Sequence, residues 1–328
     1  MTSKQMPIHS GFTASSTAAE VARGLDLHGQ VIVVTGGYSG LGLEAVRVLS
    51  QAGATVIVPA RDASRAERAL HSVPATKICA LDLMDPSSID AFADHVMARY
   101  STLNVLINVA GIMANPLTRD ARGYESQFST NHLGHFQLAV RLWPALAAAS
   151  GARIVAVSSR GHRLSPVDFD DPNFERRPYD RWLAYGQSKT ANALFAVAAD
   201  KRGKSSSIGA FSVHPGTILS NLSRHLSNDD LAGFGVTREN PHGYLPPGDS
   251  AAEGGIFKTI EQGAATVVWC AVSPQLNGYG GVYCEDVDIA VVSEASNPRE
   301  PGVNPWAFDS DAAEKLWQLS ERLTGTHL

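Results

Sequence analysis

Six short apolar runs recur along the first two thirds of the chain, and segments with helical period or composition separate them. The runs are VIVVT, TVIVPA, KICALDL, NVLIN, RIVAVS and IGAFSVH. Runs that are apolar at every position suit strands buried on both faces, because a half-exposed strand alternates with a period of two. Such strands, alternating with helices, predict a parallel sheet covered by helices. GGVYC (280–284) predicts a seventh strand.

The pattern therefore predicts one α/β domain with a doubly wound, seven-stranded, mostly parallel sheet. No internal repeat or low-complexity linker divides the 328 residues. Residues 1–28 are expected to form an N-terminal tail and a short helix, which begins at the capping box Thr17 to Glu20 and ends near Gly24. Residues 285–328 are expected to form a C-terminal extension.

Two irregular stretches interrupt the alternation, Arg160 to Trp182 and Asn221 to Gly255, and each directly follows a predicted strand. In open α/β sheets the ligand crevice lies beyond the carboxyl ends of the strands, so we expect both stretches to shape a pocket. Residues 221–255 are expected to form a lid on the substrate side. The alternative is that both are surface insertions without a role.

Composition and charge exclude several functional classes. The formal net charge is −5, without basic runs, which argues against nucleic-acid partners. The three cysteines lie far apart, without metal-ligand spacing, as expected of reduced thiols in a cytoplasmic protein. No signal peptide and no apolar run of about 18 residues is found, so no membrane span is expected. His132 and His135 form an HxxH pattern, but no third ligand follows, and we predict no metal site.

The first apolar run ends in a glycine-rich turn, Thr35-Gly-Gly-Tyr-Ser-Gly-Leu-Gly42, and the helical segment LEAVRVLSQAG follows. Glycines at 36, 40 and 42 let the backbone turn tightly and approach a pyrophosphate, which the amides and dipole of the next helix stabilise. A glycine-rich turn alone is weak support, but strand, glycines and helix in this order are the required context. The turn predicts a dinucleotide cofactor.

The end of the second run indicates which dinucleotide is bound. Pro59-Ala-Arg-Asp62 stands about 20 residues after the glycines, where an acidic residue would hydrogen-bond the ribose 2′-hydroxyl of NAD(H). Ala60 stands there instead, and Arg61 can pair bidentately with the 2′-phosphate of NADP(H), which is therefore favoured. NAD(H) stays possible, because Arg61 could be solvated while Asp62 caps the helix SRAERAL.

These features resemble the short-chain dehydrogenase/reductase family. Its TGxxxGxG stands here as TGGYSGLG, its NNAG as NVAG (108–111), its serine-bearing strand as RIVAVSS, its YxxxK as YGQSK (185–189) and its PG motif as HPGTILS (214–220). The match runs in order from about Leu25 to Tyr283. TAAEVARGLDLHGQ, NHLGHFQL, SSRGH and EQGAATVVW further resemble the retinol dehydrogenase and WW-domain oxidoreductase branch. The resemblance implies a Rossmann-type fold and an NAD(P)(H)-dependent alcohol dehydrogenase or carbonyl reductase.

The family's motifs also imply catalytic roles. Tyr185 is expected to be the general acid or base, and Lys189 to hold the nicotinamide ribose. Ser159, rather than Ser158, is expected to hydrogen-bond the reacting oxygen, and Asn131 to order a water beside the lysine.

Cofactor contacts are implied in the glycine turn, at the strand ends and in the PG motif. Asp82 is expected to meet the adenine ring, Asn108 the adenosine side, and Ile218 the nicotinamide carboxamide. The full set is Gly36, Tyr38, Ser39, Gly40, Leu41, Gly42, Arg61, Asp82, Leu83, Asn108, Ala110, Gly111, Tyr185, Lys189, Pro215, Gly216, Ile218 and Ser220.

The spacing of Tyr185 and Lys189 has a physical meaning. Four residues apart on a helix, the two side chains share one face, about 6 Å apart along the axis. A free phenol titrates near pH 10, and a close positive charge lowers its pKa by about 1–3 units. We therefore expect Lys189 to lower the pKa of Tyr185 toward working pH. An isolated Tyr-x-x-x-Lys would only be a solvated pair, so this prediction depends on the other motifs.

Two positions depart from the family pattern. Val109 replaces the second asparagine of NNAG, where a valine would simply pack at the strand end. Ser159 and Tyr185 are separated by 25 residues, about twice the number in many members. This longer segment lies near the helix that commonly pairs subunits, so either a monomer or a homodimer is expected.

The expected substrate is a bulky lipophilic alcohol or carbonyl compound. The resembling branch favours such substrates, and apolar side chains follow the sixth run at Leu219, Leu222, Leu226, Leu231 and Phe234. One alternative is an NAD-dependent catabolic alcohol dehydrogenase. An alternative of a different class is a non-catalytic regulator that senses dinucleotides, but such members usually lack the tyrosine or the lysine.

Overall fold

The computed structural model describes residues 4–218, 222, 228, 230, 258–294 and 300–328. In these residues eight strands form one sheet in the order β3-β2-β1-β4-β5-β6-β7-β8, and every neighbouring pair is parallel except β7 and β8. The strands are β1 (Val31–Thr35), β2 (Thr55–Ala60), β3 (Thr76–Ala80), β4 (Val105–Asn108), β5 (Arg153–Val157), β6 (Gly209–His214), β7 (Val282–Glu285) and β8 (Asp288–Ile289).

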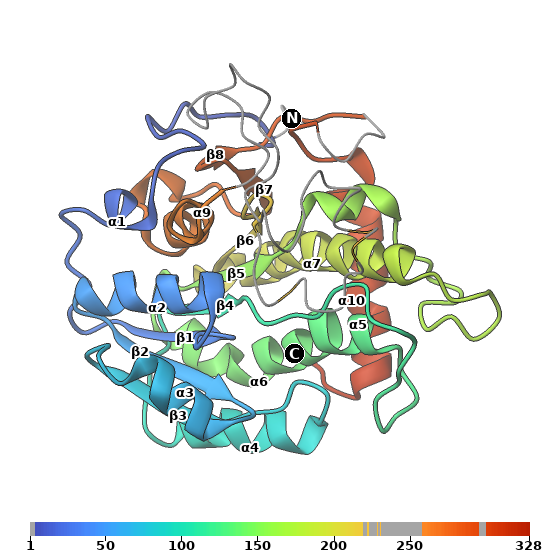
Figure 1. Ribbon diagram of the computed structural model, residues 1–328, viewed down its shortest axis with the longest axis horizontal. Coiled ribbons are helices and arrows are strands. Elements are labelled where there is room, and N and C mark those ends of the chain that lie inside the picture. Colours follow the sequence, from blue (N-terminus) through green and yellow to red (C-terminus); the bar gives the residue numbers. More distant parts are fainter. Residues whose placement is uncertain (1–3, 219–221, 223–227, 229, 231–257, 295–299) are drawn as a thin grey trace.

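Helices cover both faces of this sheet (Figure 1). One buried cluster joins α1, α2 and α9 to one face, and another joins α4, α6 and α7 to the other. The helices are α1 (Ala18–Val21), α2 (Gly40–Gln51), α3 (Ala63–Leu70), α4 (Pro86–Met97), α5 (Ser126–Phe128), α6 (Gly134–Ala148), α7 (Arg181–Gly203), α9 (Ile260–Val272) and α10 (Ser310–Thr324), with the π-helix η1 (Ser129–Leu133) and the 3-10 helices η2 (Arg160–Leu164), η3 (Lys204–Ser206), η5 (Pro274–Leu276) and η6 (Pro305–Ala307).

The predicted α/β class and doubly wound sheet are confirmed, and two details of the strand prediction were wrong. The third strand ends at Ala80 rather than running through LDL, because the Asp82 carboxylate accepts the Met84 N–H and begins a turn. The sheet has eight strands in the described residues rather than seven. The turn between β7 and β8 places Asp286 and Val287 at positive φ, and β8 is too short to give an apolar pattern.

The expected helix starts are present. Thr17 and Glu20 form the capping box of α1, and the Asp62 side chain caps α3 by accepting the Arg65 N–H. The tail before α1 lies along the sheet edge. The Gln5 side chain bonds both the N–H and the carbonyl oxygen of Tyr283 in β7.

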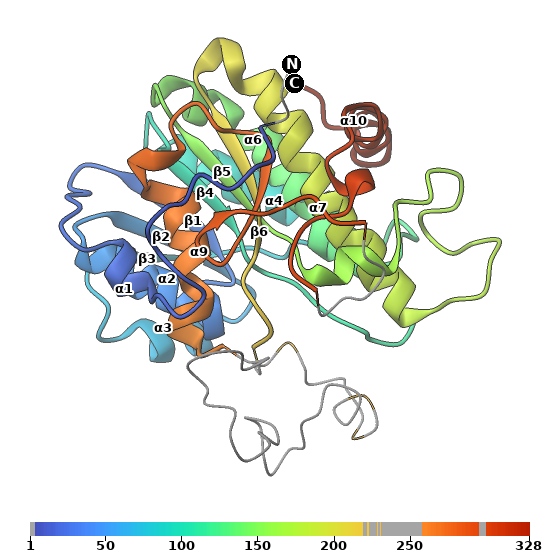
Figure 2. The same ribbon diagram turned by 90° about the horizontal axis from the view of Figure 1, so that it is seen from above.

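The C-terminal helix α10 packs along the outer side of α7 (Figures 1 and 2). Trp317 of α10 is buried and stacks on Phe195 of α7, with ring centroids 6.0 Å apart. Within the described ranges no helix is long and apolar enough to span a bilayer.

The topology gathers chemistry at one edge of the sheet. The carboxyl ends of parallel strands lie at the same edge of the sheet. That edge therefore carries the residues that end or closely follow β1, β2, β4 and β5, which are Thr35, Arg61, Asn108 and Ser159.

Candidate active site

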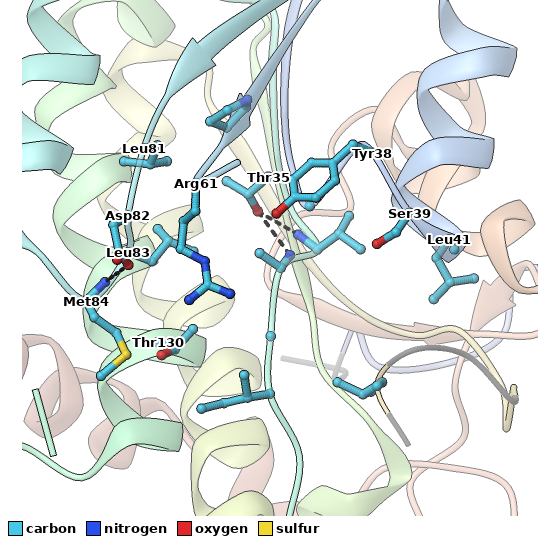
Figure 3. Close-up of a pocket in the computed structure, with 18 of the residues that line it drawn as sticks. Thr35, Tyr38, Ser39, Leu41, Arg61, Leu81, Asp82, Leu83, Met84 and Thr130 are labelled. Carbon is cyan, nitrogen blue, oxygen red and sulfur yellow. Dashed lines mark hydrogen bonds between the residues drawn. The ribbon is translucent and has the colours of Figure 1, made fainter. Parts of the chain in front are cut away.

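A cavity of about 400 Å³ opens at the carboxyl ends of β1 to β4 (Figure 3). Its wall combines the glycine turn, the ends of four strands and the start of η1. The lining residues are Thr35, Gly36, Tyr38, Ser39, Gly40, Leu41, Pro59, Arg61, Arg65, Leu81, Asp82, Leu83, Met84, Val109, Ala110, Gly111, Ile112, Thr130 and Leu222.

Glycines allow the backbone of the glycine turn to lie very close to neighbouring backbone. Gly36 and Gly40 have φ of 68° and 51°, which favour glycine. A Cβ atom on Gly42 would lie 2.4 Å from the Gly36 carbonyl oxygen, so only glycine lets α2 begin this close to β1. Thr35 fastens the turn to the next strand, because its Oγ1 accepts the N–H groups of Val109 and Ala110 at 3.0 and 3.1 Å.

The start of α2 differs from the other helix starts. Among the α-helices of the described residues that begin from a loop, α2 alone lacks a capping side chain, since Ser39 makes no cap hydrogen bond. Ser39, Gly40 and Leu41 line the cavity. The first amides of α2 therefore point their N–H groups and the positive end of the helix dipole toward the cavity, where an anion would be stabilised.

The residues lining the cavity fit a dinucleotide. An uncapped helix start would meet its phosphates, and Thr130 contributes a buried hydroxyl that has no hydrogen-bond partner in the described structure. At the far end, Arg61 points into the cavity between Tyr38 and Asp82 (Figure 3). Arg61 is exposed, and Arg65, one turn further along α3, lies with its guanidinium carbon 5.9 Å from the centroid of the Tyr38 ring.

The reaction end lies beside this cavity, and Gly111 connects the two. Gly111 lines the cavity, and a Cβ atom on it would lie 3.1 Å from the Asn131 amide oxygen and 3.7 Å from the Lys189 Nζ. Lys189 is buried, its Nζ donates to the Val157 carbonyl oxygen at 3.0 Å, and it lies 5.7 Å from the centroid of the Tyr185 ring. Tyr185 and Lys189 thus share one face of α7.

The two serines after β5 face different partners. The Ser159 hydroxyl is hydrogen-bonded to the Tyr185 side chain and accepts the Gly161 N–H at 3.0 Å. The Ser158 hydroxyl donates to the Lys189 carbonyl oxygen at 2.7 Å and so fastens the strand to α7. Of the two, Ser159 is therefore the hydroxyl beside the phenol.

Asn131 sits in the π-helix η1, a rare form that often occurs at functional sites. Its side-chain amide bonds the N–H and the carbonyl oxygen of Ile112 and the Ser188 hydroxyl, at 2.9 to 3.0 Å. Its own carbonyl oxygen lies 3.0 Å from the Nδ1 of His135. The asparagine thus joins the loop after β4 to α7.

The expectation for the Tyr185 pKa was wrong in sign. Burial raises the pKa of Tyr185 to about 12, and the hydrogen bond from Ser159 offsets only part of this effect. Burial also lowers the pKa of Lys189 to about 8. Desolvation of the phenolate is the largest cause of this shift, so the phenol is protonated at neutral pH.

Several expected contact residues lie outside the cavity wall. Asn108 is buried at the end of β4, and its side-chain amide has no hydrogen-bond partner among the described residues. Ile218 packs against Gly263 of α9 and near Leu41. Gly42, Pro215, Gly216, Tyr185 and Lys189 also do not line the cavity. Ser220 and nearly all of the predicted lid, residues 221–255, lie outside the described residues.

The long segment between β5 and α7 is held by its own hydrogen bonds and by those of Arg119. The Asp171 carboxylate accepts the N–H groups of Glu175, Arg176 and Arg177, and the Arg119 guanidinium donates to the Asn173 and Phe174 carbonyl oxygens. None of residues 160–182 is among those lining the cavity.

The HxxH histidines have structural partners. The Nε2 of His132 lies 2.7 Å from the Ser320 hydroxyl of α10, and the Nε2 of His135 lies 2.9 Å from the Thr35 hydroxyl. Burial lowers the pKa of both, to about 3 and about 4, so both are neutral. Across the part of the chain that the structure describes, no cluster of three or more His, Cys, Asp or Glu could hold a metal ion.

Outside the glycine turn, sequence reasoning missed two polar residues of the cavity wall, Arg65 and Thr130. Arg65 repeats the basic residue at 61 one helical turn later, a spacing that could have identified it. Thr130 precedes Asn131, but only the π-helix directs it to the cavity, and no sequence pattern reveals that turn.

Comparisons with known proteins agree with this geometry. A family model described as short chain dehydrogenase matches residues 30–231. A Streptomyces lividans protein named "Probable oxidoreductase" is 44% identical over 300 residues, which cover 90% of this chain and 97% of the relative. Retinol dehydrogenase 12 of Homo sapiens is 34% identical over 307 residues, covering 92% and 88%. The crystal structure of an uncharacterized protein from Mycobacterium paratuberculosis superposes with a TM-score of 0.69 at 32% identity, covering 94% and 97%.

Proposed function

Because this chain belongs to the short-chain dehydrogenase/reductase family, and within it resembles the retinol dehydrogenase branch, we propose that it interconverts an alcohol and its ketone or aldehyde with NADP(H). The observation that carries the proposal is the group formed by the buried Tyr185 and Lys189 and the half-buried Ser159, which Gly111 joins to a cavity suited to a dinucleotide.

Each residue of the site has its own proposed role in the reaction. The bound cofactor supplies or accepts the hydride. In the reducing direction Tyr185 donates its phenolic proton to the carbonyl oxygen, and the Ser159 hydroxyl hydrogen-bonds that oxygen and fixes its position. A phenol that is protonated at neutral pH suits this acid role. Lys189 is placed to hold the ribose beside it, and Asn131 fixes the loop that carries Gly111.

Arg61 and Arg65 support NADP(H) over NAD(H). Both line the cavity, and no carboxylate stands at Ala60, where the 2′-hydroxyl of NAD(H) would be bound. Asp62 caps α3 and Arg61 is exposed, as the alternative expected, but the Arg61 side chain points into the cavity, which favours its pairing with a 2′-phosphate.

The proposed substrate is a bulky lipophilic alcohol or carbonyl compound, which rests on the resemblance to retinol dehydrogenase 12 and on the apolar residues after β6. The main rival proposal is a dinucleotide sensor without turnover. The intact group of tyrosine, lysine, serine and asparagine favours an enzyme.

The test is NADPH oxidation, followed by absorbance, with a panel of aliphatic, aromatic and polycyclic aldehydes and ketones, with NADH in parallel. We expect turnover with NADPH that Tyr185→Phe lowers by roughly 10²–10⁴. Tight NADPH binding in a fluorescence titration, without turnover of any compound in either direction, would support the sensor instead.

A further inference from the structure

The chain after β8 returns to the turn that carries Ser159. We call residues 301–306 the strap. Val303 and Asn304 of the strap are fully buried, and a parallel bridge pairs Val303 with Val292. The strap lies beyond residues 30–231, which the family model matches.

Two arginines of η2 hold the strap. The Nε of Arg160 lies 3.2 Å from one carboxylate oxygen of Glu285, and the other oxygen accepts the Gly302 N–H. The Arg163 guanidinium donates to the carbonyl oxygens of Pro301 and Gly302 at 3.0 and 2.9 Å. These contacts bring the strap against η2.

Between the arginines, His162 bridges the strap to the serine itself. The imidazole is fully buried, with its Nδ1 2.7 Å from the Ser159 carbonyl oxygen and its Nε2 3.1 Å from the Asn304 backbone nitrogen. The carbonyl can only accept and the amide can only donate, so Nδ1 carries the proton and Nε2 offers its lone pair. Burial lowers the pKa of His162 to about 4, so this neutral form is present throughout the neutral range.

We propose that His162 is a positioning residue for the reaction, whose imidazole ties the peptide of Ser159 to the strap and thereby holds the serine hydroxyl against Tyr185. The proposal rests on the proposed function. Two further contacts hold Ser159. Its hydroxyl makes hydrogen bonds, and its carbonyl oxygen also accepts the backbone N–H of His162. Without the imidazole, the carbonyl and the Asn304 N–H would each lose a buried partner, and the turn would relax. A displacement of about 1 Å at a reacting group can lower a rate by about 10².

Substitutions at both ends of the bridge test this. His162→Phe keeps a ring and removes the bonds to Ser159 and Asn304, together with the 3.3 Å contact between Nδ1 and the Tyr283 hydroxyl, whereas His162→Asn keeps a donor near Nδ1. Asn304→Pro removes the N–H together with the buried carboxamide side chain, at a residue whose φ of −73° already suits proline. We expect His162→Phe to lower kcat for carbonyl reduction about 10- to 100-fold with NADPH affinity within about twofold. His162→Asn should restore part of kcat, and Asn304→Pro should lower it in the same direction.

Ser320→Ala is the matched control, because it removes the hydroxyl partner of another buried imidazole, that of His132, on the C-terminal helix. It should lower the melting temperature as the bridge variants do, yet leave kcat unchanged. If His162→Phe and Asn304→Pro keep full kcat, or if Ser320→Ala loses as much kcat for the same fall in melting temperature, the positioning role is refuted.

Hydrogen exchange provides a readout that needs no turnover. In His162→Phe and Asn304→Pro, amides in residues 158–165 should exchange faster than in the wild type, while those of α2 and α9 stay unchanged. Should the wild type reduce no carbonyl compound, the proposed function would fail, and this measurement would still decide the bridge. Equal exchange at 158–165 in all variants would overturn the inference.

Discussion

The reaction end and the nucleotide end of the site are constructed differently. Tyr185 and Lys189 are buried, and the ammonium group and the flanking serines bond to neighbouring backbone or side chains. Arg61 and Arg65, at the other end of the cavity, are exposed to solvent. The reaction end is thus buried and hydrogen-bonded, whereas the two arginines of the nucleotide end are exposed.

This difference in burial determines how strongly a substitution is expected to affect rate or cofactor binding. In a buried site a charge or proton interacts through a low dielectric, and a small displacement has a large effect on the rate. At an exposed site solvent and salt screen the same charges, so a single pair contributes about 1 kcal/mol or less. Substitutions should therefore act strongly at the reaction end and weakly at the nucleotide end.

The largest effect is expected at Tyr185. Tyr185→Phe keeps the ring and its packing but removes the transferable proton, so kcat should fall by roughly 10²–10⁴ while NADPH affinity stays near normal. Single-turnover kinetics and fluorescence titration measure the two quantities. Tyr279→Phe, at a partly exposed tyrosine after η5, is the control and should behave as the wild type. Undiminished turnover in Tyr185→Phe would mean that another group is the acid.

Lys189→Met should weaken both turnover and binding, because the ammonium is proposed to hold the ribose as well as to support the phenol. Combined with Tyr185→Phe, it should cost much less than the sum of the separate losses, since residues that act as one unit are not additive. Additive losses would show that the two side chains act independently.

Because the pKa of Lys189 is lowered, the affinity for NADPH is expected to depend on pH. The ammonium is protonated below about pH 8 and loses its charge as pH rises through that value. If binding requires the charged form, NADPH affinity in the wild type should fall progressively above about pH 8. In Lys189→Met the affinity should be weaker but flat across pH 7 to about 9.5. The same decline in both proteins would assign it to another group.

Gly161 provides an intermediate case, because it touches the catalytic ring without taking part in the chemistry. A Cβ atom on Gly161 would lie 2.7 Å from the Tyr185 Cε1 atom, so Gly161→Ala should displace the ring and lower kcat by about tenfold or more. Gly209→Ala is a matched control, since its Cβ would meet only Phe211 at an ordinary 3.5 Å. Equal kcat in both variants would show that the ring tolerates displacement.

The contrast between the two ends also explains what the sequence could predict. Strands such as VIVVT are apolar at every position, and the glycine turn and YGQSK are local patterns, so their elements could be placed from the sequence. The direction of the Tyr185 pKa shift could not be predicted from the sequence. The spacing shows that Lys189 is near Tyr185, but it does not show how much hydration both groups lose on burial. The π-helix at Asn131 and the bridge from His162 to Asn304 depend on tertiary packing, which leaves no periodic pattern.

The smallest effect is expected at Arg61. Arg61→Ala removes a charge that is proposed to pair with the 2′-phosphate, so the KM for NADPH should rise about two- to fivefold, while the KM for NADH, which lacks this phosphate, should hardly change. The effect should shrink as salt is added, because the pair is exposed and screened. Arg68→Ala, in the helix α3 that follows Arg61, is also exposed but not part of the cavity wall, and it controls for the general loss of positive charge. Steady-state kinetics with both cofactors at low and high salt measure all of these quantities. A parallel rise for NADPH and NADH would remove the basis for NADP(H) preference and leave Arg61 as a solvated side chain beside the cap of α3.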